Sequence, residues 1–249
     1  MGEVIAFVSG KGGTGKTSLC AGVALALAAR GEKVLCVDCD VGLGNLDISL
    51  GLADCGALSF REVSEGGYPL SRAAVHPSQA RLSFLTAPVN CQPDQIDPVA
   101  FAEMLRLARQ EFAYIFLDVA SGLGAGFRMA AENGDRCVVV ACPDPASIRA
   151  AGRVGQALEL MGKNQARLAV NRIQPVMVAG MGLTVDDVMD QTGLPLLGIL
   201  PEDPNIPFAA AFGKPLLSYA KKSDAAAALD RIAQRIQGLP VRIPVKKFI

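Results

Sequence analysis

Short apolar runs alternate along the chain with longer stretches in which apolar residues recur every three or four positions. The runs are almost continuously apolar, as in "EVIAFV" (3–8) and "YIFLDV" (114–119), which is typical of strands buried on both faces of a sheet. The expected strands are 3–8, 33–38, 82–87, 114–119, 136–142, 167–172 and 195–200, and the expected helices are 16–30, 98–111, 145–161, 184–192 and 223–237. This alternation predicts an α/β fold in which a mainly parallel, twisted sheet carries helices on both faces.

The last expected helix, 223–237, is amphipathic. Its apolar residues recur at positions 225, 229, 232 and 236, and this spacing places them on one face toward the core. Arg231 and Arg235 are expected on the opposite, solvated face.

The bulk composition fits one globular domain. Of the 249 residues, 51% are hydrophobic and 19% are charged, which suits a large core and argues against disorder. The longest apolar stretch, 21–29, is far shorter than the ~20 residues that a membrane-spanning helix needs. The start of the chain lacks the pattern of a signal peptide. We therefore expect a cytoplasmic protein with a single domain over residues 1–238 and a basic and apolar tail over 239–249.

The cysteines and the one histidine give no sign of a metal site. Cys36 and Cys39 have the spacing of a metal or redox pair, but no second such pair follows and both lie within an apolar run. The seven cysteines are therefore expected to be reduced and to act as small apolar residues. His76 is expected in a surface loop, and a single histidine excludes chemistry that needs several.

One glycine-rich stretch, "SGKGGTGKTS" (9–18), lies between an expected strand and an expected helix. It contains Gly10-x4-Gly15-Lys16-Thr17, the pattern of a P-loop, in which backbone N–H groups at a helix N-terminus surround phosphates. Lys16 is expected to reach the β- and γ-phosphates of a nucleoside triphosphate, and the Thr17 hydroxyl to bind Mg²⁺. The residues of the loop expected to contact the nucleotide are Gly10, Lys11, Gly12, Gly13, Thr14, Gly15, Lys16, Thr17 and Ser18.

Carboxylates end two of the expected strands. Asp118 closes "YIFLD" as an acidic residue of the Walker B type, and Asp38 and Asp40 follow the strand after the P-loop helix. Because side chains alternate along a strand, Asp38 and Asp40 point the same way, toward the phosphates. One of them can support Mg²⁺ while the other orients a water molecule. The expected metal site comprises Thr17, Asp38 and Asp118.

These segments together resemble the ParA/MinD family of ATPases, and the resemblance covers nearly the whole chain. GKGGTGKT (10–17) resembles the family's deviant Walker A motif, whose hallmark is a lysine after the first glycine, here Lys11. VDCDVGLGNLD (37–47) resembles its switch I, YIFLDVASGLG (114–124) its switch II and LAVNRI (168–173) its adenine-reading segment. The stretch 181–206 resembles the MinD branch more than the other branches.

The resemblance implies ATP and Mg²⁺ as ligands and a homodimer in the ATP state. Lys11 would reach into the partner's site, Lys16 would act in its own site, and Asp40 would position the attacking water. Asp38 and Asp118 would support Mg²⁺. The residues that the resemblance places at the base are Asn171, Arg172, Pro201, Glu202 and Asp203.

The implied activity is slow, Mg²⁺-dependent ATP hydrolysis that switches a dimer controlling the placement of the cell-division site, with MinC- and MinE-like regulators as partners. Other members of the family remain as alternatives: a flagellar-number regulator, a DNA-segregation ParA, or a carrier or reductase of metal clusters. A cluster carrier needs cysteines in switch II, and "DVASGLGAG" (118–126) has none. The net charge is zero, so binding to nucleic acid is not expected.

The chain departs from the family pattern in three places. In the helix expected over 145–161, Ala150 and Gly152 occupy positions where MinD proteins normally carry acidic residues that contact the dimer partner and MinC or MinE. Switch II reads Asp118-Val119-Ala120, without the proline that MinD proteins usually carry. In the tail, Pro240 and Pro244 prevent the amphipathic membrane helix of MinD. Three basic residues lie beside apolar ones, so three interpretations are open: a weak contact with an anionic membrane at the inner face of the cell membrane, packing against the domain, or a truncated anchor. The residues concerned are Arg242, Ile243, Val245, Lys246, Lys247, Phe248 and Ile249.

Overall fold

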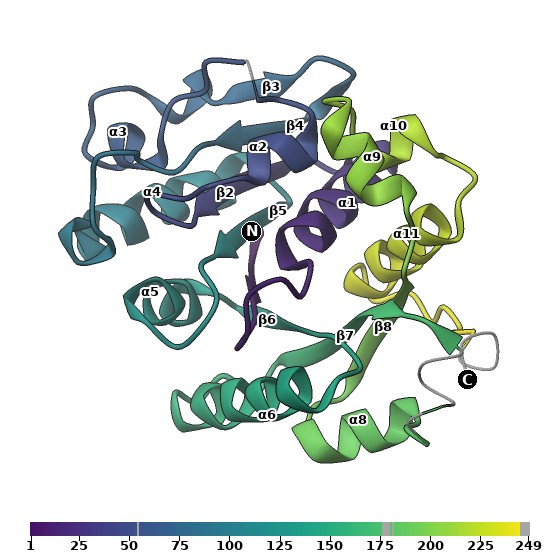
Figure 1. Ribbon diagram of the computed structural model, residues 1–249. Helices are drawn as coiled ribbons and strands as arrows, with labels where there is room; N and C mark the ends of the chain where they lie inside the picture. The colour runs from purple at the N-terminus through teal and green to yellow at the C-terminus, as the bar shows by residue number, and fades with distance from the viewer. Residues whose placement is uncertain (54, 176–179, 181, 245–249) are drawn as a thin grey trace.

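The computed structural model describes residues 1–53, 55–175, 180 and 182–244, and they contain one eight-stranded sheet with helices on both faces (Figure 1). The strand order is β3-β4-β2-β5-β1-β6-β7-β8, and every neighbouring pair is parallel except β3 and β4. The strands are β1 (Glu3–Val8), β2 (Val34–Cys39), β3 (Ala74–His76), β4 (Gln79–Leu85), β5 (Tyr114–Val119), β6 (Arg136–Ala141), β7 (Ala166–Ile173) and β8 (Leu196–Pro201). The predicted α/β fold is confirmed.

The helices divide between the two faces of the sheet (Figure 1). One face carries α3 (Phe60–Ser64), α4 (Pro98–Glu111), α5 (Ala125–Asn133), α6 (Pro145–Leu160) and α8 (Val185–Thr192). The other face carries α1 (Lys16–Ala29), α2 (Leu46–Leu50), α9 (Asn205–Ala211), α10 (Leu216–Tyr219) and α11 (Asp224–Ile236). Two short 3₁₀ turns, Leu70–Arg72 and Pro93–Gln95, lie in the loops.

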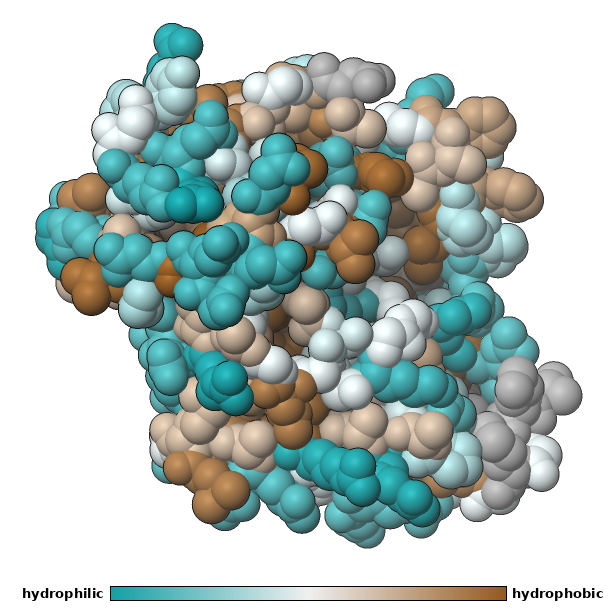
Figure 2. Space-filling view, turned by 60° about the vertical axis from the view of Figure 1, so that its left-hand side comes forward, coloured by the Kyte–Doolittle hydropathy of each residue, from teal (hydrophilic) through white to brown (hydrophobic). Residues whose placement is uncertain are grey.

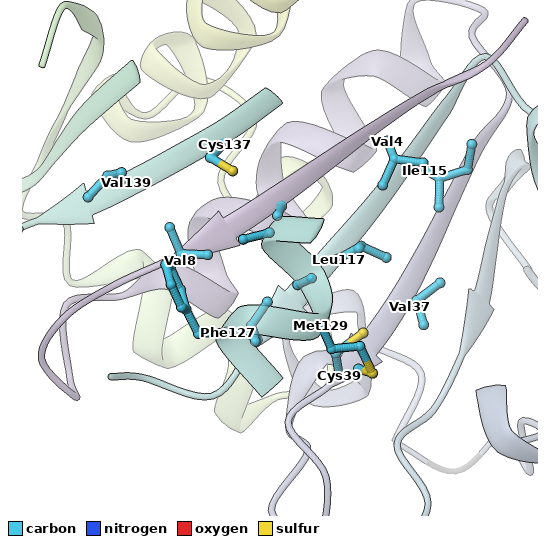
Figure 3. Close-up of a cluster of buried hydrophobic side chains, with 14 of the residues drawn as sticks. Val4, Val8, Val37, Cys39, Ile115, Leu117, Phe127, Met129, Cys137 and Val139 are labelled. Carbon is cyan, nitrogen blue, oxygen red and sulfur yellow. The ribbon is translucent and has the colours of Figure 1, made fainter. Parts of the chain in front are cut away.

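Two layers of apolar side chains fill the space between the sheet and the helices. Figure 3 shows part of one layer, in which Phe127 and Met129 of α5 lie over Val37, Leu117 and neighbouring strand residues. In the other layer, α1 is apolar on almost every side because it lies between the sheet and α11. Figure 2 shows that on the visible outer face hydrophobic residues occur in small groups among hydrophilic ones.

Long elements begin and end close to their expected positions because local signals mark their ends. The helix predicted over 98–111 is α4, which begins after Asp97, whose carboxylate accepts from the N–H of Val99 at 2.8 Å. Among the described residues, the helices and strands that were not predicted are short or lie in glycine-rich sequence, and they are α2, α3, β3, α5, α9 and α10. Elements of about one turn carry too little periodicity to be predicted from sequence.

Two side chains differ from their expected surroundings. His76 was expected in a surface loop, and this is wrong: it lies on β3 with 3% of its surface exposed. Arg235 was expected on a solvated face of the last helix, and this is also wrong: it donates to the carbonyl oxygens of Leu197 (2.7 Å) and Val241 (2.9 Å). Each side chain forms a hydrogen bond with a backbone carbonyl group of another element, His76 with Leu50 of α2 and Arg235 with Leu197 of β8. Local sequence does not reveal such contacts.

The first residues of the predicted tail contact the domain. Besides the bond from Arg235 to Val241, Ile243 packs against the core layer that α6 and α8 cover. The remaining tail residues, 245–249, which include Lys246 and Lys247, lie outside the described residues. Within the part of the chain that the structure describes, no helix is both long and apolar enough to cross a bilayer.

Candidate nucleotide-binding site

The glycine-rich loop connects the end of β1 to the first turn of α1, and its conformation requires glycine. Gly13 and Gly15 have positive φ angles of 77° and 79°, which other residues adopt at a cost. Gly10 packs against α6 so closely that a Cβ atom would lie 2.5 Å from the carbonyl oxygen of Ala150. The loop therefore exposes its backbone N–H groups at the N-terminus of α1, where an anion is stabilised.

The two lysines of the loop lie in different surroundings. Lys16 is 7% exposed, and its Nζ donates to Oδ1 of Asp118 at 2.6 Å and lies 3.4 Å from the hydroxyl of Thr17. The Lys11 side chain is 48% exposed and forms an ion pair with Asp144 at the start of α6, at 3.1 Å. Lys16 thus lies inside the loop, and Lys11 lies on its outer surface.

Asp38 and Asp118 lie side by side at the carboxyl ends of β2 and β5, where they are direct partners in the strand register. Both are 1% exposed. Burial raises the pKa of Asp38 to about 7, although the backbone N–H groups of Leu46 and Asp40 donate to it. Burial also raises the pKa of Asp118, against the opposing effect of Lys16. The pair therefore carries negative charge that a cation would stabilise.

The donor set suits Mg²⁺ bound jointly by protein and phosphates. Among the described residues, no group of three or more His, Cys, Asp or Glu side chains is arranged to hold a metal ion alone. Mg²⁺ usually keeps several waters and takes one or two carboxylates together with substrate phosphates. Thr17, Asp38 and Asp118 provide a hydroxyl and two carboxylates next to the phosphate loop, and half-buried Asp40 lies just beyond β2.

A cavity of about 270 Å³ opens beside the loop, between the ends of β7 and β8 and the start of α9. Ser18 of the loop lines this cavity, together with all five residues that were predicted to contact the adenine base. These five are Asn171, Arg172, Pro201, Glu202 and Asp203. The rest of the lining comes from Gly13 and Gly15 of the loop and from three residues of the unpredicted α9, which are Ile206, Pro207 and Ala210. In the sequence, the "PEDP" turn (201–204) directly before α9 could have indicated that a helix begins there.

The polar groups of this cavity are engaged within the protein. Asn171 is 3% exposed, and its amide donates to the carbonyl oxygen of Thr14 at 2.7 Å, so it holds the phosphate loop. The Arg172 backbone has a positive φ of 59°, and its guanidinium donates to Glu202 at 2.7 Å. The carboxylate of Asp203 accepts from the N–H of Asn205, the first residue of α9. The amide nitrogen of Asn171 has a second hydrogen, so the residue can donate to a base in the cavity while it keeps its bond to Thr14.

A second cavity, of about 220 Å³, lies on the other side of Arg172, between Lys11 and the start of α6. Asp144 lines it, and sequence analysis missed this residue although its position before Pro145 is typical of a helix N-cap. The hydroxyl of Thr14, in the loop between the two cavities, is buried and has no partner among the described residues. An uncompensated buried hydroxyl of this kind fits a site that a polar ligand completes.

A glycine-rich loop at the N-terminus of a helix, a buried lysine within it and two carboxylates on adjacent strands define a P-loop nucleotide-binding protein. The family described as "CobQ/CobB/MinD/ParA nucleotide binding domain" matches residues 5–216. The chain belongs to this family, and its resemblance to the MinD branch is confirmed by the relatives that follow.

The relatives match over almost their whole length. The septum site-determining protein MinD of Synechocystis sp. is 34% identical over 240 residues, which cover 96% of this chain and 90% of that protein. MinD in the MinC:MinD complex of Aquifex aeolicus superimposes with a TM-score of 0.89 at 33% identity, covering 97% and 98% of the two chains. MinD of Pyrococcus horikoshii, solved with Mg-ADP, has a TM-score of 0.82 at 27% identity, covering 95% and 96%.

Proposed function

We propose that the protein is an ATP-driven dimerisation switch of the MinD type that takes part in placing the cell-division site. The observation that carries the proposal is the pair of lysines in one loop, with Lys16 buried against Asp118 and Lys11 exposed on the outer surface. A buried lysine serves the phosphates of its own site. An exposed lysine in the same loop is free to meet the phosphates bound by a second subunit.

Several residues would act together on the bound nucleotide. The N–H groups of the loop bind the phosphates, and Lys16 exchanges Asp118 for a phosphate oxygen. Thr17, Asp38 and Asp118 would hold Mg²⁺, which neutralises phosphate charge when bound. Asp40 lies half-buried at the end of β2, where its carboxylate can orient a water molecule for slow hydrolysis.

Lys11 must leave Asp144 before it can act in a partner subunit. Both side chains are exposed, at 48% and 39%, and an ion pair between exposed groups contributes only about 0–1 kcal/mol. Phosphate in the facing site offers Lys11 more negative charge than one carboxylate does. Dimerisation would therefore depend on the nucleotide, and we propose a MinC-like regulator as a further partner because a MinC:MinD complex is among the similar structures.

Light scattering after size-exclusion chromatography tests the proposal, with ATP, ADP and no nucleotide. We expect dimers with Mg²⁺ and ATP only, and slow phosphate release that EDTA abolishes. Lys16→Ala should lose nucleotide binding, whereas Lys11→Ala should bind nucleotide with an affinity within about threefold of wild type and stay monomeric.

The matched control is Lys33→Ala, which removes an exposed lysine just before β2, at the opposite end of the sheet. Its dimerisation should equal that of the unmodified protein. Dimers of Lys11→Ala that form as readily as wild type would contradict the proposed action of Lys11 in the partner's site. Absence of nucleotide binding by the wild type would contradict the function as a whole.

A further inference from the structure

His76, the single histidine of the chain, is a buried polar side chain on the edge strand β3. Its Nε2 lies 2.9 Å from the carbonyl oxygen of Leu50, and its Nδ1 lies 3.2 Å from the backbone nitrogen of Ser78. A backbone N–H only donates and a carbonyl only accepts. Nδ1 is therefore unprotonated, and Nε2 carries the hydrogen that it donates to Leu50.

Leu50 is the last residue of α2, a helix of five residues. A helix this short does not persist on its own, so contacts with the rest of the protein determine where it lies. The buried side chains of Leu46 and Leu50 pack in the core layer that contains α1, and hydrogen bonds fix the position of the helix along its axis at both ends. At its start, the N–H of Leu46 donates to Oδ2 of Asp38 at 3.0 Å. At its end, the carbonyl of Leu50 accepts from His76, and the following Gly51 turns with a φ of 72°.

The first of these contacts belongs to the proposed Mg²⁺ site. The carboxylate of Asp38 is buried and accepts only two backbone hydrogen bonds among the described residues, from Asp40 and Leu46. If α2 shifted along its axis, Leu46 would move away from Asp38, and a buried carboxylate would lose one of its two donors. Loss of such a donor changes both the charge state and the orientation of the carboxylate.

We infer that His76 is a positioning residue for the Mg²⁺ side of the nucleotide site. It holds the carboxyl end of α2, and the helix in turn holds the Leu46 N–H against Asp38. The hydrogen bonds of His76 go to Leu50 and Ser78, neither of which is proposed to contact nucleotide or metal, so it acts through α2. The inference rests on the proposed function in one respect, that the site binds nucleotide together with Mg²⁺.

Two substitutions separate the two hydrogen bonds of the ring. Glutamine places its amide nitrogen near the position of Nε2, so His76→Gln can still donate to Leu50. Asparagine places its polar atoms near the position of Nδ1, so His76→Asn can accept from Ser78 but does not reach Leu50. The measurement is the affinity for ADP by calorimetry, with Mg²⁺ and with EDTA, at a temperature where each variant is folded by circular dichroism.

We expect the gain in ADP affinity on adding Mg²⁺ to fall about tenfold in His76→Asn and to stay within about twofold of wild type in His76→Gln. Affinity in EDTA should be unchanged in both, because the phosphate loop is not altered. Val188→Ala, which removes buried methyl groups from α8, controls for general loss of stability. An unchanged Mg²⁺ effect in His76→Asn, or an equal loss in Val188→Ala, would overturn the inference.

A measurement without substitution covers the case that His76→Asn does not fold. In untagged protein labelled with ¹⁵N-histidine, the ring nitrogens give one set of signals because the chain has one histidine. We expect the Nε2–H tautomer, with signals that shift on adding Mg-ADP and not on adding ADP in EDTA. Identical shifts in the two titrations would refute the link to Mg²⁺. No binding in either titration would instead contradict the proposed function.

Discussion

Two carboxylates that share a buried position make the metal-free site electrostatically unfavourable. Asp38 and Asp118 are partners on adjacent strands, and only Asp118 has a cationic partner among the described residues, Lys16. The sequence predicted that both residues end apolar strands beside the phosphate loop. It could not predict their pKa values, because burial depends on the helices and loops that cover the strand ends.

The raised pKa of Asp38 predicts that the metal-free protein loses stability as pH rises. A folded-state pKa of about 7, against an ordinary 3.8, means that the folded state binds more protons than the unfolded state across this range. Between pH 6 and 8 the expected loss is about 1.4 kcal/mol. Melting temperature in EDTA should fall, and the increase caused by Mg-ADP should grow over the same range.

The buried His76 has a lowered pKa, and its contribution has the opposite sign, because stability then rises with pH up to about its unfolded value of 6.5. The measurement is therefore repeated in His76→Gln, which lacks this titration. A melting temperature of that variant that rises steadily from pH 6 to 8 would rule out ionisation of Asp38 in this range.

At the scale of elements, the phosphate loop and α6 are packed backbone against backbone at Gly10 and Ala150. The sequence predicted both elements, the loop at 9–18 and the helix at 145–161. It could not predict that Gly10 meets Ala150, because the two residues are far apart in the chain and nothing in either segment encodes the contact. The contact is possible only because β1 and β6 are neighbours in the sheet.

Gly10→Ala should therefore destabilise the protein by about 1–3 kcal/mol, because the added methyl group would overlap the backbone of α6. Gly12→Ala is the matched control in the same loop, where a Cβ atom would meet nothing closer than Ser121 Oγ at 3.5 Å. Its free energy of unfolding should change by less than about 0.5 kcal/mol. Urea denaturation of the nucleotide-free proteins gives both values, and equal losses would refute the steric explanation.

At the scale of the molecule, sequence reasoning predicted the fold class because strands buried on both faces are continuously apolar. It divided the chain at residue 238 because two prolines and a change of composition follow. The structure adds contacts beyond that point, from Arg235 to Val241 and from Ile243 to the core. Prolines stop a helix but do not prevent an extended segment from packing, so composition alone left the position of 239–244 open.

Two truncations test where the domain ends. A chain ending at Pro244 keeps the contacts of Val241 and Ile243 and is the reference for the comparison. A chain ending at Gly238 loses both, and burial of one aliphatic side chain contributes about 1.5–3 kcal/mol when complete. Because Ile243 is only partly buried, its loss should lower the melting temperature by about 2–6 °C. Equal melting temperatures would support the boundary at 238.

The enclosure of helix α1 has a mechanical consequence for the molecule. Its 14 residues span about 21 Å from Lys16 to Ala29, and it is enclosed by the sheet and α11. At its far end Arg30 donates to Gln237 at 2.8 Å, next to the start of the C-terminal segment. Because α1 is enclosed, its packing opposes bending, and it keeps a fixed distance between the phosphate loop and the last turn of α11. Any rearrangement on nucleotide binding would therefore leave this spacing constant and move the loops around it.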